Sequence, residues 1–198
     1  MDFTRETLFA MLREAIADPR ASARRIMAMD IDTGTRRLML VLVAVLSVLV
    51  LYGGLGLIAA LTGQAGGLAA LPPPLAVAVL LGGVMAVMAV LAWAVGRQFG
   101  GTGSLADAIL LVVWLHAVMI AVQIVQLIVL FLLPPFGSVV TLAALGLLFW
   151  MLTNFVAELH GFRSAGRVFA GVIGTFFAAS LVLSILLSIF IGEPPQGL

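Results

Sequence analysis

The apolar run at residues 105–133 constrains the fold more than any other stretch of the chain. As a helix it would rise about 43 Å, against a bilayer hydrocarbon core of about 30 Å, so it must tilt, kink or project beyond that core. The composition agrees, because 63% of the 198 residues are apolar, 10% are charged and the mean hydropathy is +1.26. The sequence therefore predicts an all-α, polytopic membrane protein.

Four further apolar runs predict four further membrane-spanning helices, which gives a five-transmembrane-helix bundle. Proline marks two of the boundaries, because Pro72 precedes the second span and Pro134 separates the third span from the fourth. We therefore divide the chain into an amphipathic N-terminal segment, residues 1–37, and a transmembrane domain, residues 38–198. The predicted spans are residues 38–61, 73–95, 105–133, 139–159 and 168–191.

The N-terminal segment predicts two short helices on the cytosolic side or at the membrane interface. In residues 4–16, apolar and charged side chains recur at a spacing that is typical of an amphipathic helix. Asp18 followed by Pro19 provides an N-cap and a first turn for a second helix that ends near residue 29. Two interpretations fit these helices: docking on anionic lipid or a protein partner, and ordinary anchoring at the interface.

The arginines predict how the chain is threaded through the membrane. All ten basic residues are arginines, and they lie in the N-terminal segment, between the second and third spans, or between the fourth and fifth. The positive-inside rule then makes the N-terminus cytoplasmic, and five spans make the C-terminus periplasmic. Because lysine is absent and Ala, Gly, Leu and Val dominate the composition, we expect a bacterial inner membrane. The candidate lipid or partner contacts are Arg20, Arg24, Arg25, Arg36, Arg37, Arg163 and Arg167.

Polar side chains within the third span form the first half of a candidate intramembrane cluster. His116, Gln123 and Gln126 are separated by seven and three residues, so they fall within an arc of roughly 80° on one helix face. Such side chains seldom face lipid, and they serve either as hydrogen-bond partners for neighbouring helices or as a path for protons or solutes. We expect hydrogen bonds to neighbouring helices.

The second half of the candidate cluster is Asn154 and Glu158, near the end of the fourth span. The two residues are four apart and therefore share one helix face. We expect Glu158 to pair with Arg163 or Arg167 across the following turn.

The chain lacks the residue patterns of known membrane hydrolases. It has two histidines, no adjacent carboxylates, no cysteine and no Gly-x-Ser-x-Gly sequence, so the common metalloprotease and serine hydrolase sites are missing. The glycine-rich stretch that ends at Ser104 lacks the lysine of a nucleotide loop, and Ser104 with Asp107 instead predicts a capping box. We therefore predict no enzyme activity, no catalytic residue, no metal and no cofactor, and we do not expect nucleic acid as a partner.

Three short motifs accompany this layout: Asp18-Pro19, Gly100-Gly-Thr-Gly-Ser104 before the third span, and Glu158-Leu-His160-Gly161-Phe162-Arg163 before the fifth. With them the chain resembles the Yip1 family of five-helix membrane proteins, especially its bacterial branch, from residue 17 onward. The resemblance implies a membrane fold without a catalytic site. Eukaryotic members are associated with small-GTPase-linked vesicle traffic, but their Asp-Leu-x-Gly-Pro type motif and the usual proline in the third helix are absent here. A GTPase partner is therefore not carried over from the family to this chain.

We predict a non-enzymatic integral membrane scaffold or accessory subunit that acts through helix contacts and lipid contacts. Its expected partners are membrane lipids and another membrane protein, or a second copy of itself. The alternative is a small transporter or channel-like carrier that uses four residues of the polar cluster: His116, Gln123, Gln126 and Glu158. A hydrated cavity from His116 to Glu158 would favour the carrier, and a dry bundle with an apolar lateral groove would favour a partner or lipid site.

Overall fold

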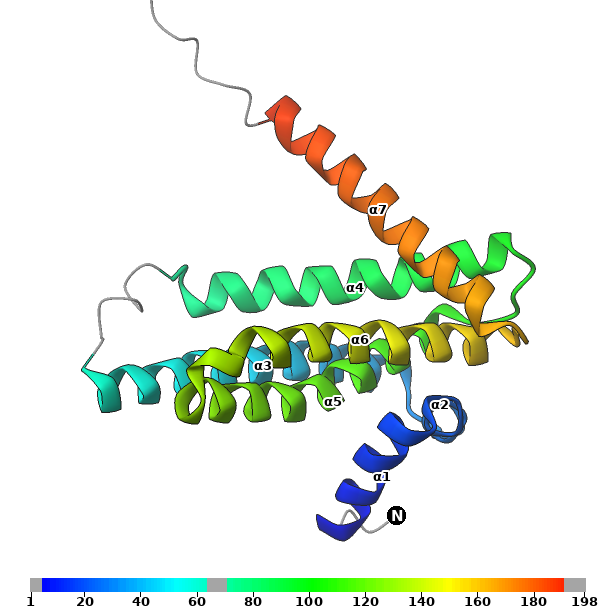
Figure 1. The fold of residues 1–198 in the computed structure, drawn as a ribbon. Helices are drawn as coiled ribbons and strands as arrows, with labels where there is room; N and C mark the ends of the chain where they lie inside the picture. Colours follow the sequence, from blue (N-terminus) through cyan, green and yellow to red (C-terminus); the bar gives the residue numbers. More distant parts are fainter. Residues whose placement is uncertain (1–4, 64–70, 191–198) are drawn as a thin grey trace, which may run out of the picture.

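The computed structural model describes residues 5–63 and 71–190, and within these ranges the chain contains helices and turns but no strand (Figure 1). Five of the helices are long and apolar enough to cross a membrane, which confirms the predicted fold class. In chain order the elements are α1 (Arg5–Ala17), α2 (Pro19–Met27), α3 (Thr33–Thr62), α4 (Pro74–Gln98), α5 (Leu105–Leu132), the short 3-10 helix η2 (Pro134–Phe136), α6 (Gly137–His160) and α7 (Ala165–Phe190).

The starts of α2 and α3 are set by aspartate caps. Asp18 accepts a hydrogen bond from the N–H group of Ala21 at 3.0 Å, and Asp32 accepts one from Thr35 at 3.0 Å. Each carboxylate satisfies a backbone donor that has no partner within its own helix. As a result α2 starts at Pro19, where the sequence predicts. Helix α3 starts at Thr33, five residues before the predicted start at residue 38, because the polar residues that follow the Asp32 cap are also helical.

Helix α5 is the centre of the bundle. It packs against α3, α4 and α6 (Figure 1), and its fully buried side chains all lie in its first half, between Ala108 and Val118. Met11 of α1 and Ile26 of α2 belong to the same apolar core. The core therefore sits at the end of the bundle where α3 and α5 begin and α4 and α6 end.

We call this end the arginine end, because every arginine of the chain lies in it or beside it: in α1, in α2, near the start of α3, in the last turn of α4, or around the turn between α6 and α7.

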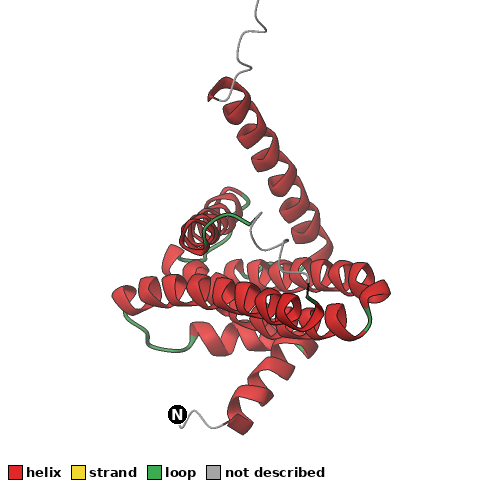
Figure 2. Ribbon diagram, turned by 90° about the vertical axis from the view of Figure 1, so that its left-hand side faces the viewer, coloured by secondary structure: helices red, strands yellow, loops and turns green. Residues whose placement is uncertain are grey.

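Helix α7 leans away from the other four long helices, as both views show (Figures 1 and 2). Its single buried side chain among those described is Val168, and Phe176 makes an edge-to-face contact with Phe149 of α6 at 5.9 Å between ring centroids. Beyond Phe176 the described side chains of α7 are exposed, except for half-buried Ala179, and lipid would cover them.

Parts of three predicted segments lie outside the described residues. They are residues 1–4 of the N-terminal segment, residues 64–70 of the linker between the first two spans, and residues 191–198, which include the last residue of the predicted fifth span and the C-terminal tail.

Candidate functional site: the arginine end of the bundle

Helix α2 is docked against α5 through a buried hydroxyl group. The indole Nε1 of Trp114 on α5 donates a hydrogen bond to Ser22 Oγ at 2.9 Å, and Ser22 is only 2% exposed. Ala23, the next residue, is fully buried. Small side chains on this face let the backbone of α2 approach α5 closely, and the indole gains a partner that lipid could not provide.

Two arginines of α2 contact polar residues of α6. Arg24 pairs with Glu158 at 3.1 Å, and Arg20 Nε donates a hydrogen bond to Asn154 Oδ1 at 3.4 Å. The amide of Asn154 also donates to the carbonyl oxygen of Trp150, one turn earlier in α6, at 2.8 Å. We call the six residues that join α2 to the bundle the α2 docking network: Arg20, Ser22, Arg24, Trp114, Asn154 and Glu158.

The pairing of Glu158 corrects the sequence prediction. We expected Arg163 or Arg167, which are close in the sequence, but the partner is Arg24. The reason is that α2 packs against the end of α6, which brings the Arg24 guanidinium group to the Glu158 carboxylate. Neither Arg163 nor Arg167 forms a side-chain ion pair within residues 5–63 and 71–190.

Two further ion pairs connect neighbouring elements. Arg25 of α2 pairs with Glu14 of α1 at 2.9 Å, and Arg36 of α3 pairs with Asp107 of α5 at 2.9 Å. Arg36 also donates to the carbonyl oxygen of Ile31 at 2.8 Å. Four of the seven arginines predicted to contact lipid or a partner, Arg20, Arg24, Arg25 and Arg36, therefore have partners within the chain.

His160, the last residue of α6, is held by hydrogen bonds on both ring nitrogens. The N–H group of Gly103 donates to Nδ1 at 3.2 Å, and Nε2 lies 3.0 Å from the carbonyl oxygen of Ala92. Because Nδ1 accepts and the carbonyl can only accept, this network assigns the proton to Nε2 and makes the ring neutral. The ring, 3% exposed, thus joins α4, the loop before α5, and α6.

Three glycines make room for the end of α6, two of them for the His160 ring and one for Leu159, and we call them the glycine cradle: Gly96, Gly101 and Gly103. A Cβ atom at Gly96 or Gly101 would overlap the His160 imidazole, and one at Gly103 would lie 2.8 Å from the carbonyl oxygen of Leu159. This role was not among the predictions from the sequence. For Gly101 and Gly103 a signal was present, because a capping box needs only Ser104 and Asp107 and leaves the glycines before it unexplained.

The predicted capping box is present in a modified form. Ser104 Oγ accepts from the N–H group of Asp107 at 3.0 Å, as expected. The Asp107 carboxylate, however, accepts from the Ser104 hydroxyl at 2.6 Å and from Arg36, rather than from the backbone of Ser104. Attraction to the guanidinium group of Arg36 explains the change.

The polar residues of α5 make separate contacts. Gln123 donates to the carbonyl oxygen of Ser47 on α3 at 3.2 Å, which confirms the expected interhelical hydrogen bond. His116 Nδ1 instead bonds the carbonyl oxygen of Val112 in its own helix at 3.0 Å, because side chains in a helix point back toward the preceding turn. Gln126 is half-buried and has no hydrogen bond within the described part of the chain. There, no hydrogen bond joins these three residues to Asn154 or Glu158.

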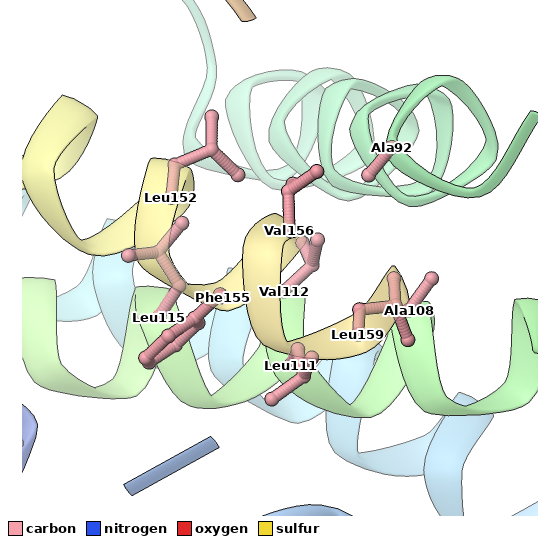
Figure 3. A pocket seen from close by; sticks show the side chains of 9 residues that line it. All are labelled: Ala92, Ala108, Leu111, Val112, Leu115, Leu152, Phe155, Val156 and Leu159. Carbon is pink, nitrogen blue, oxygen red and sulfur yellow. The ribbon is translucent and has the colours of Figure 1, made fainter. Parts of the chain in front are cut away.

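A small cavity between α4, α5 and α6 is entirely apolar (Figure 3). Its volume is about 10 Å³, room for no more than one water molecule, and no polar side chain is present to hold one. Its lining consists of Ala92, Ala108, Leu111, Val112, Leu115, Leu152, Phe155, Val156 and Leu159.

A larger groove of about 320 Å³ lies on the side of the bundle between α3, α4 and α5. Its lining consists of Arg37, Leu40, Val41, Ala86, Val90, Leu105 and Ile109.

Comparison with protein families gives one match. The family model described as the Yip1 domain matches residues 13–187, which extend from α1 into α7 and include both the α2 docking network and the glycine cradle. No curated protein and no solved structure matches the chain. Within the described residues, no three histidine, aspartate or glutamate side chains come together as a metal site.

The glycine cradle predicts that Gly96→Ala lowers the melting temperature of the detergent-solubilised protein. The added methyl group must displace a ring that is fixed at both nitrogens, and overpacking of this kind costs about 1–3 kcal/mol. Gly83→Ala in the same helix is the matched control, because a Cβ atom there meets no atom within 4 Å and alanine favours the helix. Adding His160→Ala should reduce the cost of Gly96→Ala, and equal melting temperatures for the two glycine variants would contradict the cradle.

The α2 docking network predicts energetic coupling between Arg24 and Glu158. A double-mutant cycle with Arg24→Gln and Glu158→Gln should give about 0.2–1 kcal/mol, because the Arg24 side chain is largely exposed, and the coupling should weaken in high salt. The control cycle replaces Arg24→Gln by Arg163→Gln and should give no coupling. Coupling of Glu158 to Arg163 instead would contradict the described contact between α2 and α6.

Proposed function

The chain belongs to the Yip1 domain family, and we propose that it is a non-enzymatic integral membrane scaffold or accessory subunit. It is a multi-pass membrane protein with five candidate spans. In this role it holds another membrane protein, or a second copy of itself, through helix contacts and through its N-terminal helices. The observation that carries the proposal is the α2 docking network, because it fixes those helices to the bundle as a rigid surface.

Helix α1 offers that surface to a partner. Met11 and Ala15 are buried against the rest of the protein, whereas Leu8, Phe9 and Ile16 are exposed, and Phe9 is 72% exposed. The Arg25–Glu14 pair and the α2 docking network hold the helix in place. Large apolar side chains that are held outward at a membrane surface suit contact with the interfacial lipid layer or with a partner helix.

The interior of the bundle supports a role without catalysis or transport. The cavity between α4, α5 and α6 is small and apolar, so it offers neither a substrate site nor a polar path. Of the four polar residues assigned to the carrier alternative, Gln123 and Glu158 are engaged in contacts between helices and His116 bonds its own helix, whereas Gln126 has no hydrogen bond within the described residues. These contacts favour the scaffold.

We further propose that the protein lies in a bacterial inner membrane with the arginine end in the cytoplasm. This orientation predicts that alkaline phosphatase fused after Leu198 is active in the periplasm, and that a fluorescent protein fused before Met1 fluoresces in the cytoplasm. The control exchanges the two reporters, and both should then be silent. Activity of a C-terminal reporter in the cytoplasm would overturn the orientation.

The scaffold role predicts stoichiometric co-purification of a second membrane protein, or a defined oligomer, from mild detergent. Phe9→Ser should weaken that association several-fold, because it removes the most exposed apolar side chain of α1. Phe99→Ser is the matched control, since Phe99 is exposed to a similar extent at the end of α4.

The carrier alternative is tested on the same preparation in proteoliposomes. A pH-dependent flux that disappears in His116→Leu would favour the carrier over the scaffold. A monomer that retains no partner would contradict the scaffold.

A further inference from the structure

The lateral groove combines apolar walls with one cationic side chain at the arginine end of the bundle. Helices α3 and α4 are in contact at Gly82, where a Cβ atom would lie 3.8 Å from the side chains of Leu40 and Ala44. Beyond that contact, toward the ends that carry Arg37 and Arg97, the groove opens between the two helices, and α5 contributes Leu105 and Ile109 to its lining. Among the described residues, Arg37 is the only charged one that lines the groove.

Arg37 differs from its neighbour Arg36. The side chain of Arg36 is 12% exposed and pairs with Asp107, whereas Arg37 is exposed and has no ion pair within residues 5–63 and 71–190. Within residues 5–63 and 71–190, no carboxylate lines the groove. Asp107 lies between two lining residues of α5 in the sequence, but Arg36 and the Ser104 hydroxyl already engage it. The groove therefore carries an uncompensated positive charge.

We propose that this groove binds one anionic glycerophospholipid. An acyl chain lies along the apolar walls formed by Leu40, Val41 and Val90, and the headgroup phosphate receives hydrogen bonds from the Arg37 guanidinium group. The planar guanidinium matches a phosphate with two parallel hydrogen bonds, and basic side chains at a membrane surface attract anionic lipid. The volume falls in the range of about 300–1,000 Å³ that is typical of ligand sites.

The charge of the groove selects among phospholipids. A zwitterionic headgroup brings an ammonium group, for which the groove offers no carboxylate partner. An anionic headgroup such as phosphatidylglycerol brings one negative charge to one guanidinium group. The site therefore prefers the anionic lipid, and this preference does not depend on the scaffold role.

The test is native mass spectrometry of the purified full chain, titrated separately with phosphatidylglycerol and phosphatidylethanolamine. Arg37→Gln should weaken phosphatidylglycerol binding roughly fivefold and remove the preference between the two lipids. Ala86→Trp fills the groove and should reduce binding of both lipids. The matched controls are Arg163→Gln, which removes an exposed arginine outside the groove, and Val87→Trp, which places the same indole at a 57% exposed position that does not line it.

Three results would overturn the proposal. Equal lipid binding by Ala86→Trp and Val87→Trp would mean that lipid coats the bundle without a site. A preference for phosphatidylglycerol that survives Arg37→Gln would remove the headgroup contact. A change of oligomeric state in Ala86→Trp, with lipid binding unchanged, would assign the groove to an interface between copies. These three outcomes of the lipid-binding test do not depend on the result of the co-purification experiment.

Discussion

The bilayer is as apolar as the helices it surrounds, and this constraint governs how the bundle is held together. Burial of leucine or valine against another helix gains little over contact with lipid, so helix association depends on close fit and on polar contacts that lipid cannot replace. The arginine end supplies both. Its glycine cradle admits the His160 ring, and its docking network pairs α2 with α5 and α6. Helix α7 has neither of these contacts and leans outward.

Features that depend on local sequence were predictable. Apolar runs long enough to cross the hydrocarbon core as helices predicted the five spans. The caps at Asp18 and Asp32 follow from short-range hydrogen-bonding rules. Gln123 was correctly expected to bond a neighbouring helix, because an amide within a membrane needs a partner.

The missed contacts join residues far apart in the chain. Arg24 and Glu158 meet only once α2 has folded beneath α6, and the sequence near Glu158 offered closer arginines. Helices that are apolar on all sides carry no stripe that shows which face meets which neighbour, so the contact of Gly96 with His160 left no periodic signal. Arg20 and Arg24 were assigned to lipid or a partner for a different reason. A short arginine-rich helix next to a membrane has the same sequence pattern whether it lies on lipid or on its own bundle.

His160 has a consequence for how the protein is made. Its ring bonds Ala92 and Gly103, which are 68 and 57 residues earlier in the chain, and Asn154 bonds Arg20 across 134 residues. A ribosome releases these segments in order, so the end of α4, the loop before α5 and the N-terminal helices all emerge before the side chains that fasten them. Until the end of α6 has been synthesised, the first three spans lie in the membrane without these contacts, and the arginine end can be held only by contacts among the earlier helices, such as Ser22 with Trp114 and Arg36 with Asp107.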